Sequence, residues 1–151
     1  MRRSLIAVAG AVVALSAFVS VDAARKATDR EAVEKSLKMY LSGDPAQLER
    51  AFHPGATMFF ARNDSLIAVP IPEYIARVAK SRAEGAAPPQ RIERIAHVDI
   101  TGTTAVARLE LEYPQQTLTD YMSLVKYGGE WRIVNKIYSR EMKQKSPSSG
   151  Q

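Results

Sequence analysis

The second half of the sequence is dominated by four long runs that predict β-strands, and these runs constrain the fold more than any other feature. They span residues 91–101, 104–113, 117–126 and 131–139, with tight-turn sequences at Thr101-Gly102-Thr103 and Gly128-Gly129. Connections this short join antiparallel neighbours, so the runs predict an antiparallel meander. In 104–113, apolar residues occupy positions 105, 107, 109 and 111, while charged residues occupy 108, 110 and 112. One face of the sheet therefore meets a core, and the other meets water or a partner.

The residues before the meander predict helices. Thr28-Asp29-Arg30-Glu31 fits a capping box at the start of a helix that ends at Gly43. Asp44-Pro45 begins a short second helix, which His53-Pro54-Gly55 ends. A hairpin of residues 57–62 and 66–69 then leads to a third helix over about 72–84 and a flexible connector over 85–89. Helices followed by a long sheet predict an α+β fold, with N-terminal helices packed on one face of a curved antiparallel sheet.

Residues 1–23 have the three parts of a secretory signal peptide. Arg2 and Arg3 are basic, residues 5–21 are uncharged, and Val21-Asp22-Ala23 offers small residues for cleavage after Ala23. The alternative is a retained anchor, because the uncharged run is at the lower limit for spanning a bilayer. We expect a periplasmic or secreted protein with no membrane segment after cleavage. Three segments follow from this: a signal peptide over 1–23, a folded domain over 24–142 and a disordered tail over 143–151.

The composition excludes several kinds of chemistry. The chain has no cysteine, so it can use no thiolate catalysis, disulfide, Fe–S cluster or cysteine-based zinc site. Its two histidines, His53 and His97, fall on separate elements and make a poor metal site, and no cofactor is implied. His97 shares the more polar parity of its strand and is expected at the surface. The formal net charge is +5, but the basic residues are spread along the chain, so nucleic acid is not an expected partner.

Several segments carry a resemblance to a known family. The break Phe52-His53-Pro54 and the stretches TDYMSLVK at 119–126 and GEWRIVNK at 129–136 resemble the lumazine-binding family of the nuclear transport factor 2-like (SnoaL-like) superfamily. The resemblance covers about residues 28–142. It implies a cone, in which a strongly bent sheet wraps around a long helix with a pocket between them. It also implies a sheet-to-sheet homodimer and a flat heterocyclic ligand. Because members include isomerases, dehydratases, hydrolases, ligand binders and dimerisation modules, the fold does not fix the function.

The best-known enzymes of this fold, the ketosteroid isomerases, provide a test of the enzyme hypothesis. They use a tyrosine on the first helix and an aspartate at the end of the first strand. By resemblance these roles fall on Ser36 and Phe60. Phe60 cannot abstract a proton and Ser36 is a poorer oxyanion donor than a phenol, so this chemistry is not expected. His53 could act as a general base at the pocket mouth, but we interpret it as a helix-end imidazole that bonds backbone carbonyls.

Asp120 is the polar side chain that most needs an explanation. It shares the parity of the apolar residues at 118, 122 and 124, so its carboxylate is expected on an inward stripe. Asn135 likewise shares the parity of Trp131 and Ile133, whereas Lys136 is expected on the outward face with Arg108, Glu110, Glu112 and Arg132. Burying an unpaired polar group costs on the order of a few kcal/mol. Asp120 and Asn135 therefore either satisfy each other or backbone amides, or they contact a ligand.

These observations predict an exported, cofactor-free domain that binds a small apolar or aromatic molecule in its cone. Two alternatives stay open. One is a lyase or isomerase with Asp120 as base and His53 or Tyr121 as donor, although the sequence shows no complete catalytic set. The other is a homodimeric protein-interaction module whose cone is only core. The candidate ligand-binding residues are Asp120 and Asn135 for orientation, Tyr40, Phe60 and Tyr121 for stacking, and His53 at the mouth.

Overall fold

The computed structural model describes the backbone of residues 7–144 and the side chains of 23–144. Its first helix, α1 (Ala7–Leu41), is continuous through the expected cleavage position and through Thr28. The predicted capping box is therefore wrong, because the Thr28 hydroxyl donates to the Arg25 carbonyl at 2.8 Å within the helix. Residues 1–6 of the expected signal peptide, and most of the expected tail, lie outside the described residues. Within the described part of the chain, no helix has the length and apolarity to cross a membrane.

Two short helices and a hairpin follow α1. Asp44 caps α2 (Pro45–Ala51) by accepting a hydrogen bond from the Gln47 amide at 2.9 Å, as predicted. The chain then enters β1 (Phe52–Arg62) at once, so His53-Pro54-Gly55 lies in a strand. Asn63 and Asp64 both have positive φ, which suits the tight turn into β2 (Ser65–Pro70). The third helix, α3 (Ile71–Ala83), begins directly after this strand.

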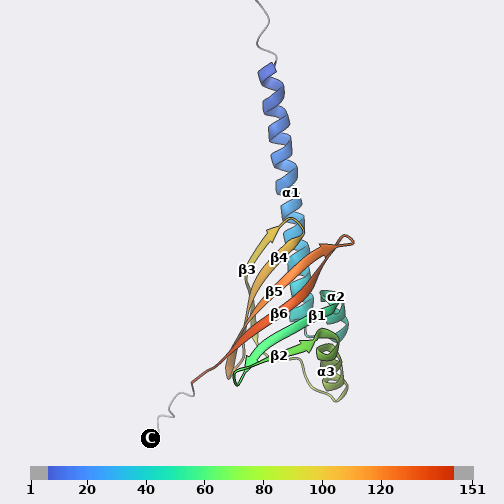
Figure 1. Cartoon of the computed structure of the whole chain (residues 1–151), viewed down its shortest axis with the longest axis vertical. Coiled ribbons are helices and arrows are strands. Elements are labelled where there is room, and N and C mark those ends of the chain that lie inside the picture. Colours follow the sequence, from blue (N-terminus) through green and yellow to red (C-terminus); the bar gives the residue numbers. More distant parts are fainter. Residues whose placement is uncertain (1–6, 145–151) are drawn as a thin grey trace, which may run out of the picture.

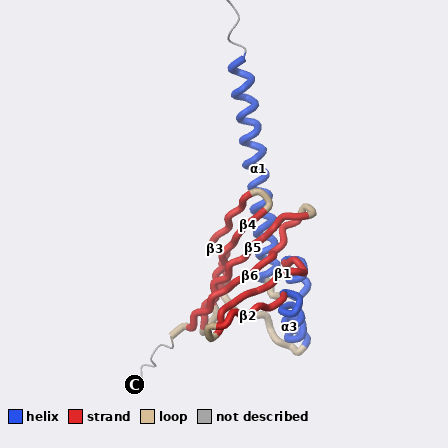
Figure 2. Tube along the Cα trace, viewed as in Figure 1, coloured by secondary structure: helices blue, strands red, loops and turns tan. Residues whose placement is uncertain are grey.

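The predicted meander is confirmed as four successive antiparallel strands: β3 (Ile92–Thr101), β4 (Thr104–Glu112), β5 (Gln116–Tyr127) and β6 (Glu130–Met142). The full sheet has the order β2-β1-β6-β5-β4-β3. It is mixed, because β1 runs parallel to β6, so the prediction of a wholly antiparallel sheet is wrong at this pair. These two strands are joined by no hairpin, since α3 and four strands separate them in the chain. The curved, unclosed sheet wraps the C-terminal part of α1, with α2 and α3 at its lower end (Figures 1 and 2).

The core fills the space between α1 and the inner face of this sheet. Val33, Leu37 and Tyr40 supply the helix side, and Leu109, Met122, Leu124 and Ile133 are among the strand residues that meet them. Polar contacts fix the helix against the last two strands. The Ser36 hydroxyl donates to the Trp131 carbonyl at 2.7 Å, and the Asp29 carboxylate accepts from the Trp131 indole at 3.0 Å and from Lys126 Nζ at 2.5 Å. Ser36 thus has a structural partner of its own.

A β-bulge changes the direction of the side chains in β6. Ser123 pairs with Asn135 but the next residue, Leu124, pairs with Ile133, so Val134 is an extra residue on β6. Trp131 and Ile133 are buried before the bulge, and Lys136 is buried after it. The predicted outward position of Lys136 is therefore wrong, because one additional residue reverses the alternation. A second irregularity between Ile95 and His97 leaves His97 exposed, as predicted.

Candidate functional site

Three polar side chains from three different elements meet inside the cone. Tyr40 comes from the last turns of α1, Asp120 from the middle of β5, and Lys136 from β6 just after the bulge. The Tyr40 hydroxyl donates to Asp120 Oδ2 at 2.6 Å, and Lys136 Nζ donates to the Tyr40 oxygen at 2.6 Å. Lys136 Nζ also forms an ion pair with Asp120 Oδ2 at 2.9 Å. We call these three residues the buried triad.

The electrostatics of the buried triad are dominated by desolvation. Burial, and then the neighbouring Asp120 charge, hold the pKa of Tyr40 well above its usual range, so its hydroxyl remains a donor. Burial lowers the pKa of the Lys136 ammonium, and its contacts with Asp120 oppose that shift. Asp120 is fully buried, yet its Oδ1 accepts no hydrogen bond from the described residues. A buried acceptor of this kind is costly unless a further donor reaches it.

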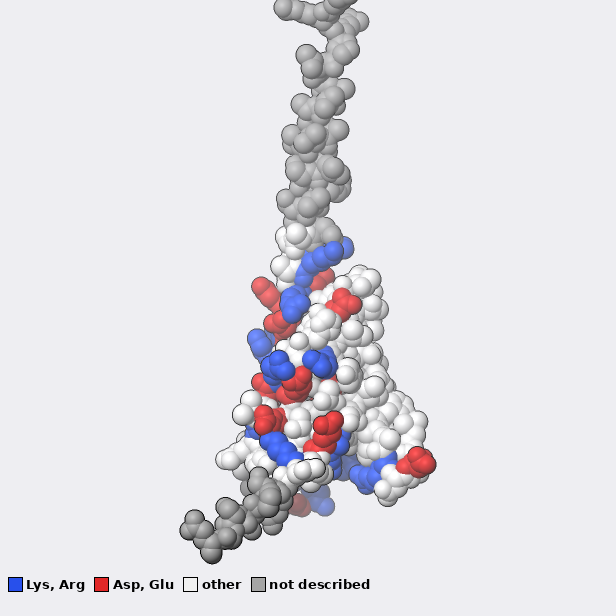
Figure 3. Space-filling model, turned by 90° about the vertical axis from the view of Figure 1, so that its left-hand side faces the viewer, with Lys and Arg blue, Asp and Glu red and all other residues white. Residues whose placement is uncertain are grey.

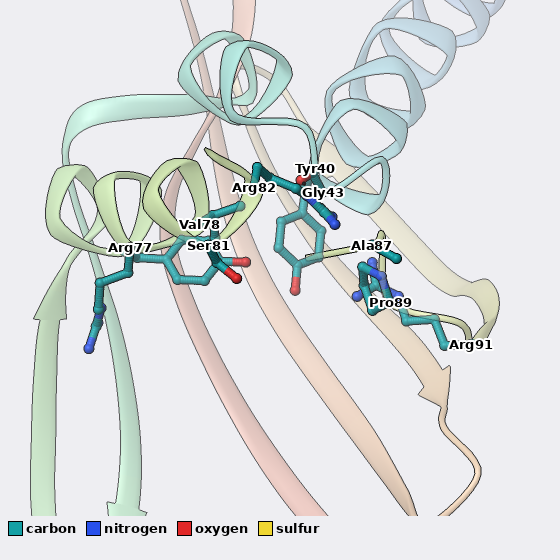
Figure 4. A pocket seen from close by; sticks show the side chains of 10 residues that line it. Tyr40, Gly43, Arg77, Val78, Ser81, Arg82, Ala87, Pro89 and Arg91 are labelled. Carbon is teal, nitrogen blue, oxygen red and sulfur yellow. Dashed lines mark hydrogen bonds between the residues drawn. The ribbon is translucent and has the colours of Figure 1, made fainter. Parts of the chain in front are cut away.

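Tyr40 also forms part of the wall of a cavity of about 390 Å³ at the end of α1. The other lining residues come from α3, from the loop before β3 and, in the case of Gly43, from the turn after α1, as Figure 4 shows. They include three arginines, one further tyrosine and small or apolar residues: Arg77, Arg82, Arg91, Tyr74, Gly43, Val78, Ser81, Ala87 and Pro89. The cavity is thus lined by aromatic and cationic groups, and the buried triad begins at its wall.

Two of the three guanidinium groups, those of Arg91 and Arg82, are held in place by hydrogen bonds. Arg91 donates to the Tyr113 hydroxyl at 2.7 Å, to the Leu41 carbonyl at 2.8 Å and to the Glu93 carboxylate at 2.7 Å. Arg82 donates to the Ala86 carbonyl at 3.0 Å and to the Gly43 carbonyl at 3.3 Å. Such contacts fix two cations at the rim of the cavity before any ligand arrives.

Gly43 ends α1 in a conformation that favours glycine, next to the Arg82 guanidinium. Its φ of +60° is in the left-handed region that favours glycine, and a Cβ at this position would meet the Arg82 guanidinium at 3.4 Å.

Tyr74 lines the same cavity from α3. Burial raises the pKa of Tyr74, and the nearby Arg91 charge opposes that shift. The hydroxyl of Tyr74 makes no hydrogen bond with the described residues, so it can bond a ligand.

The structure brings only two of the six predicted site residues together, Tyr40 and Asp120. Asn135 is half-buried and donates to the Thr57 carbonyl at 3.2 Å, which excludes the alternative in which Asp120 and Asn135 satisfy each other. Tyr121 is 48% exposed, and as the sequence neighbour of Asp120 in β5 it points to the outer face of the sheet.

Phe60 and His53 lie at other cavities. Phe60 packs against Tyr138 with ring centroids 4.9 Å apart, and both border a separate hollow near the start of the β1–β2 turn. His53 lines an apolar groove between α2, α3 and the start of β1. Its Nδ1 accepts a hydrogen bond from the Gly55 amide at 3.0 Å, so the predicted bond to a backbone carbonyl is wrong. The imidazole is a strand residue, which is why it meets a backbone N–H.

Sequence reasoning missed Lys136, Arg82 and Arg91. Lys136 carries no local signal, because the bulge that turns it inward leaves no mark in the apolar pattern. Arg91 follows the proline-rich connector, and only the packing of that connector against the end of α1 places it at the cavity. Within residues 23–144, no group of three or more His, Cys, Asp or Glu side chains is arranged to hold a metal ion.

Comparison with solved structures identifies the fold. A nuclear transport factor 2-like (NTF2-like) protein of unknown function from Shewanella baltica OS155 is 28% identical, with a TM-score of 0.65, and covers 76% of this chain and 95% of its own. An NTF2-like protein of unknown function from Methylobacillus flagellatus KT is 31% identical, with a TM-score of 0.62, and covers 76% and 93%. A third, from Silicibacter pomeroyi DSS-3, has a TM-score of 0.66 at 22% identity and covers 77% and 98%.

Two sequence comparisons complete the assignment. The aldolase FrzH of a Cladobotryum species is 42% identical over 48 residues, which is 28% of this chain and 38% of the aldolase. The chain thus spans only about two-fifths of that relative's length. The family described as "Putative lumazine-binding" matches residues 24–139, and it supports a ligand-binding domain. The chain belongs to this family and has the NTF2-like fold.

Proposed function

We propose that the domain binds a small molecule with a flat, largely aromatic body in the cavity beside Tyr40. The observation that carries this proposal is the position of Tyr40, which both lines the cavity and donates to the buried carboxylate of Asp120. A cavity with aromatic walls and a few fixed polar groups is the usual form of a small-molecule site. The family's description supports the same class of ligand.

In this proposal Asp120 orients the ligand from behind Tyr40. Asp120 is fully buried and is not among the lining residues, so it acts on the ligand through the Tyr40 hydroxyl, which donates to it. Tyr74, on α3, offers the ligand a second aromatic ring and a hydroxyl that has no hydrogen bond with the described residues. Asn135 and Tyr121 take no part, because they lie on the other face of the sheet.

The experiment is to purify the protein without refolding and to measure its mass under native conditions. A bound ligand adds a discrete mass, and screening an aromatic fragment library by ligand-observed NMR provides binders if the purified protein carries none. Replacing Tyr74 with Leu should abolish binding, whereas Tyr127→Leu is the matched control, because Tyr127 is exposed and does not line the cavity. Absence of any bound mass and of any fragment whose binding depends on Tyr74 would refute the proposal.

We further propose that the outer face of the sheet is a homodimer interface. Phe59, Ile137 and Tyr121 follow one another across β1, β6 and β5, and Val106 lies close by on β4. Ile137, Tyr121 and Val106 are 48%, 48% and 52% exposed. Neighbouring apolar side chains that are this exposed often mark a surface that another protein covers. Sedimentation equilibrium of Ile137→Lys against the unchanged protein tests this, and a dimer of unchanged strength would refute it.

Export is also proposed, on the basic start, the uncharged run and the small residues before position 24. The test is the N-terminal sequence of protein recovered from the native host. Cleavage after Ala23 is the expected result. An intact N-terminus in a membrane fraction would instead favour the retained anchor.

A second candidate function is acid–base chemistry on a carbonyl compound. Two observations favour it: the lowered pKa of the buried Lys136 amine beside a carboxylate with a free oxygen, and the local likeness to an aldolase. The test is exchange of α-hydrogens of small ketones in D2O, followed by NMR. Exchange that is lost in Asp120→Asn, while ligand binding is kept, would establish catalysis; no exchange above background would leave binding as the function.

A further inference from the structure

The charges around the cavity beside Tyr40 have a single sign. Its lining includes Arg77, Arg82 and Arg91 and contains no aspartate or glutamate. The surface on the β3 side is different, because there Lys and Arg alternate with Asp and Glu (Figure 3). A concave site lined by one sign of charge concentrates the field within it. The lining of the cavity therefore differs in charge from the mixed surface on the β3 side.

Two of these cations have no carboxylate partner among the side chains that the structure describes. Arg82 donates to two backbone carbonyls, which satisfy part of its guanidinium but do not neutralise it. Arg77 makes no hydrogen bond or ion pair with any described residue. Arg91 is paired with Glu93, yet its charge still acts on the interior, where it opposes the raised pKa values of Tyr40 and Tyr74.

The buried triad does not cancel this positive charge. Asp120 and Lys136 neutralise each other at 2.9 Å, and Tyr40 remains un-ionised. Figure 4 shows Arg82 extending from α3 to Gly43, on the same side as Arg91 and Pro89, whereas Arg77 points away from them. Arg82 and Arg91 thus lie together at the end of α1, where Arg82 donates to the Gly43 carbonyl and Arg91 to the Leu41 carbonyl.

From this arrangement we infer that the ligand is an organic anion, with a carboxylate or phosphate group at Arg82 and Arg91 and an apolar ring against Tyr40 and Tyr74. This inference rests on the proposed small-molecule function of the same cavity. Guanidinium groups recognise such anions through paired, charge-assisted hydrogen bonds. Because the backbone already positions Arg82, little side-chain order is lost when the anion binds.

The experiment compares two isosteric probes, 2-naphthoate and 2-naphthamide, by isothermal titration calorimetry with the purified protein. We expect the carboxylate to bind at least about tenfold more tightly than the amide, and its advantage to shrink as salt is raised. Arg82→Gln should remove most of the advantage, and Arg82→Lys should keep part of it. Arg50→Gln is the matched control, since Arg50 is exposed on α2 and does not line this cavity.

Each other outcome overturns the inference. Equal affinities for the two probes would show a site indifferent to charge, and would leave the proposed binding function intact. A carboxylate preference that is undiminished in Arg82→Gln would place the anion elsewhere. If neither probe binds at millimolar concentration, the inference fails, and the native mass and fragment experiments decide separately whether the cavity binds anything.

Discussion

Replacing Lys136 with Met should cost far more stability than removal of an exposed lysine. The substitution keeps the length and much of the volume of the side chain but removes the ammonium. Asp120 would then be a fully buried carboxylate whose only remaining donor within the described part of the chain is the Tyr40 hydroxyl. The energy at issue is the cost of leaving that charge without its counter-ion, which exceeds the net gain from forming the pair.

The magnitude follows from the burial of both partners. The side chains of Lys136 and Asp120 are 7% and 0% exposed at a separation of 2.9 Å, so solvent screens the pair poorly. Breaking such a pair by removing one partner costs about 3–5 kcal/mol of unfolding free energy. For a domain of roughly 120 residues this corresponds to a fall in the melting temperature of about 10–20 °C. Replacing both partners, Asp120→Leu with Lys136→Met, should recover much of the loss.

Urea denaturation followed by circular dichroism measures these differences. The matched control is Lys143→Met, which breaks the ion pair of Lys143 with Glu112, where the side chains are 38% and 52% exposed. That change should cost less than about 1 kcal/mol. The reasoning is refuted if Lys136→Met costs no more than Lys143→Met, or if the double variant is as unstable as the sum of its two single variants.

Three further predictions concern other parts of the site and its supports. Tyr40→Phe removes one donor and one acceptor from the buried triad and should lower the unfolding free energy by about 1–3 kcal/mol in urea, whereas an unchanged midpoint would show that the hydroxyl contributes nothing. Gly43→Ala forces a Cβ into a backbone with φ of +60° and should cost about 1–2 kcal/mol by the same assay, whereas an unchanged midpoint would show that a side chain is tolerated there without strain. The Lys126 hydrogen bond lowers the pKa of Asp29 below its ordinary 3.8, so its contribution is present above pH 3.8 and is lost as the pH falls through the lowered pKa. Asp29→Asn should therefore flatten the dependence of the urea midpoint on pH below 3.8, and a profile identical to that of the unchanged protein would contradict this.

Local patterns were enough to predict most of the elements. The alternation in residues 104–113 and 117–126 fixed two neighbouring strands and the inward direction of Asp120, because β5 is regular from residue 116 to 123. Glycine turns and the Asp44-Pro45 start were correct for the same reason, since each depends on only a few adjacent residues.

Features that depend on distant contacts could not be predicted. The parallel pairing of β1 with β6 joins segments about 80 residues apart in the chain, and β1 also includes Pro54 and Gly55, which by themselves favour a loop. The bulge at Val134 reversed the direction of Lys136 and Asn135 without altering the local composition. The capping box failed because the chain before Thr28 is itself helical and leaves no helix start at that point.

Because α1 is one continuous helix, it places the residues before the folded domain at one end and the cavity at the other. Residues 23–28 are exposed, and Asp29 is the first buried side chain among the described residues. Tyr40 stands 17 residues after Ala23 in the same helix, which at 1.5 Å per residue is about 25 Å along its axis. The cavity is lined by residues at the C-terminal end of α1, and Figure 1 shows that this end lies far from the start of the helix. Removal of the first 23 residues takes away no described core side chain, and attachment through them would place the cavity at the end of the helix remote from the point of attachment.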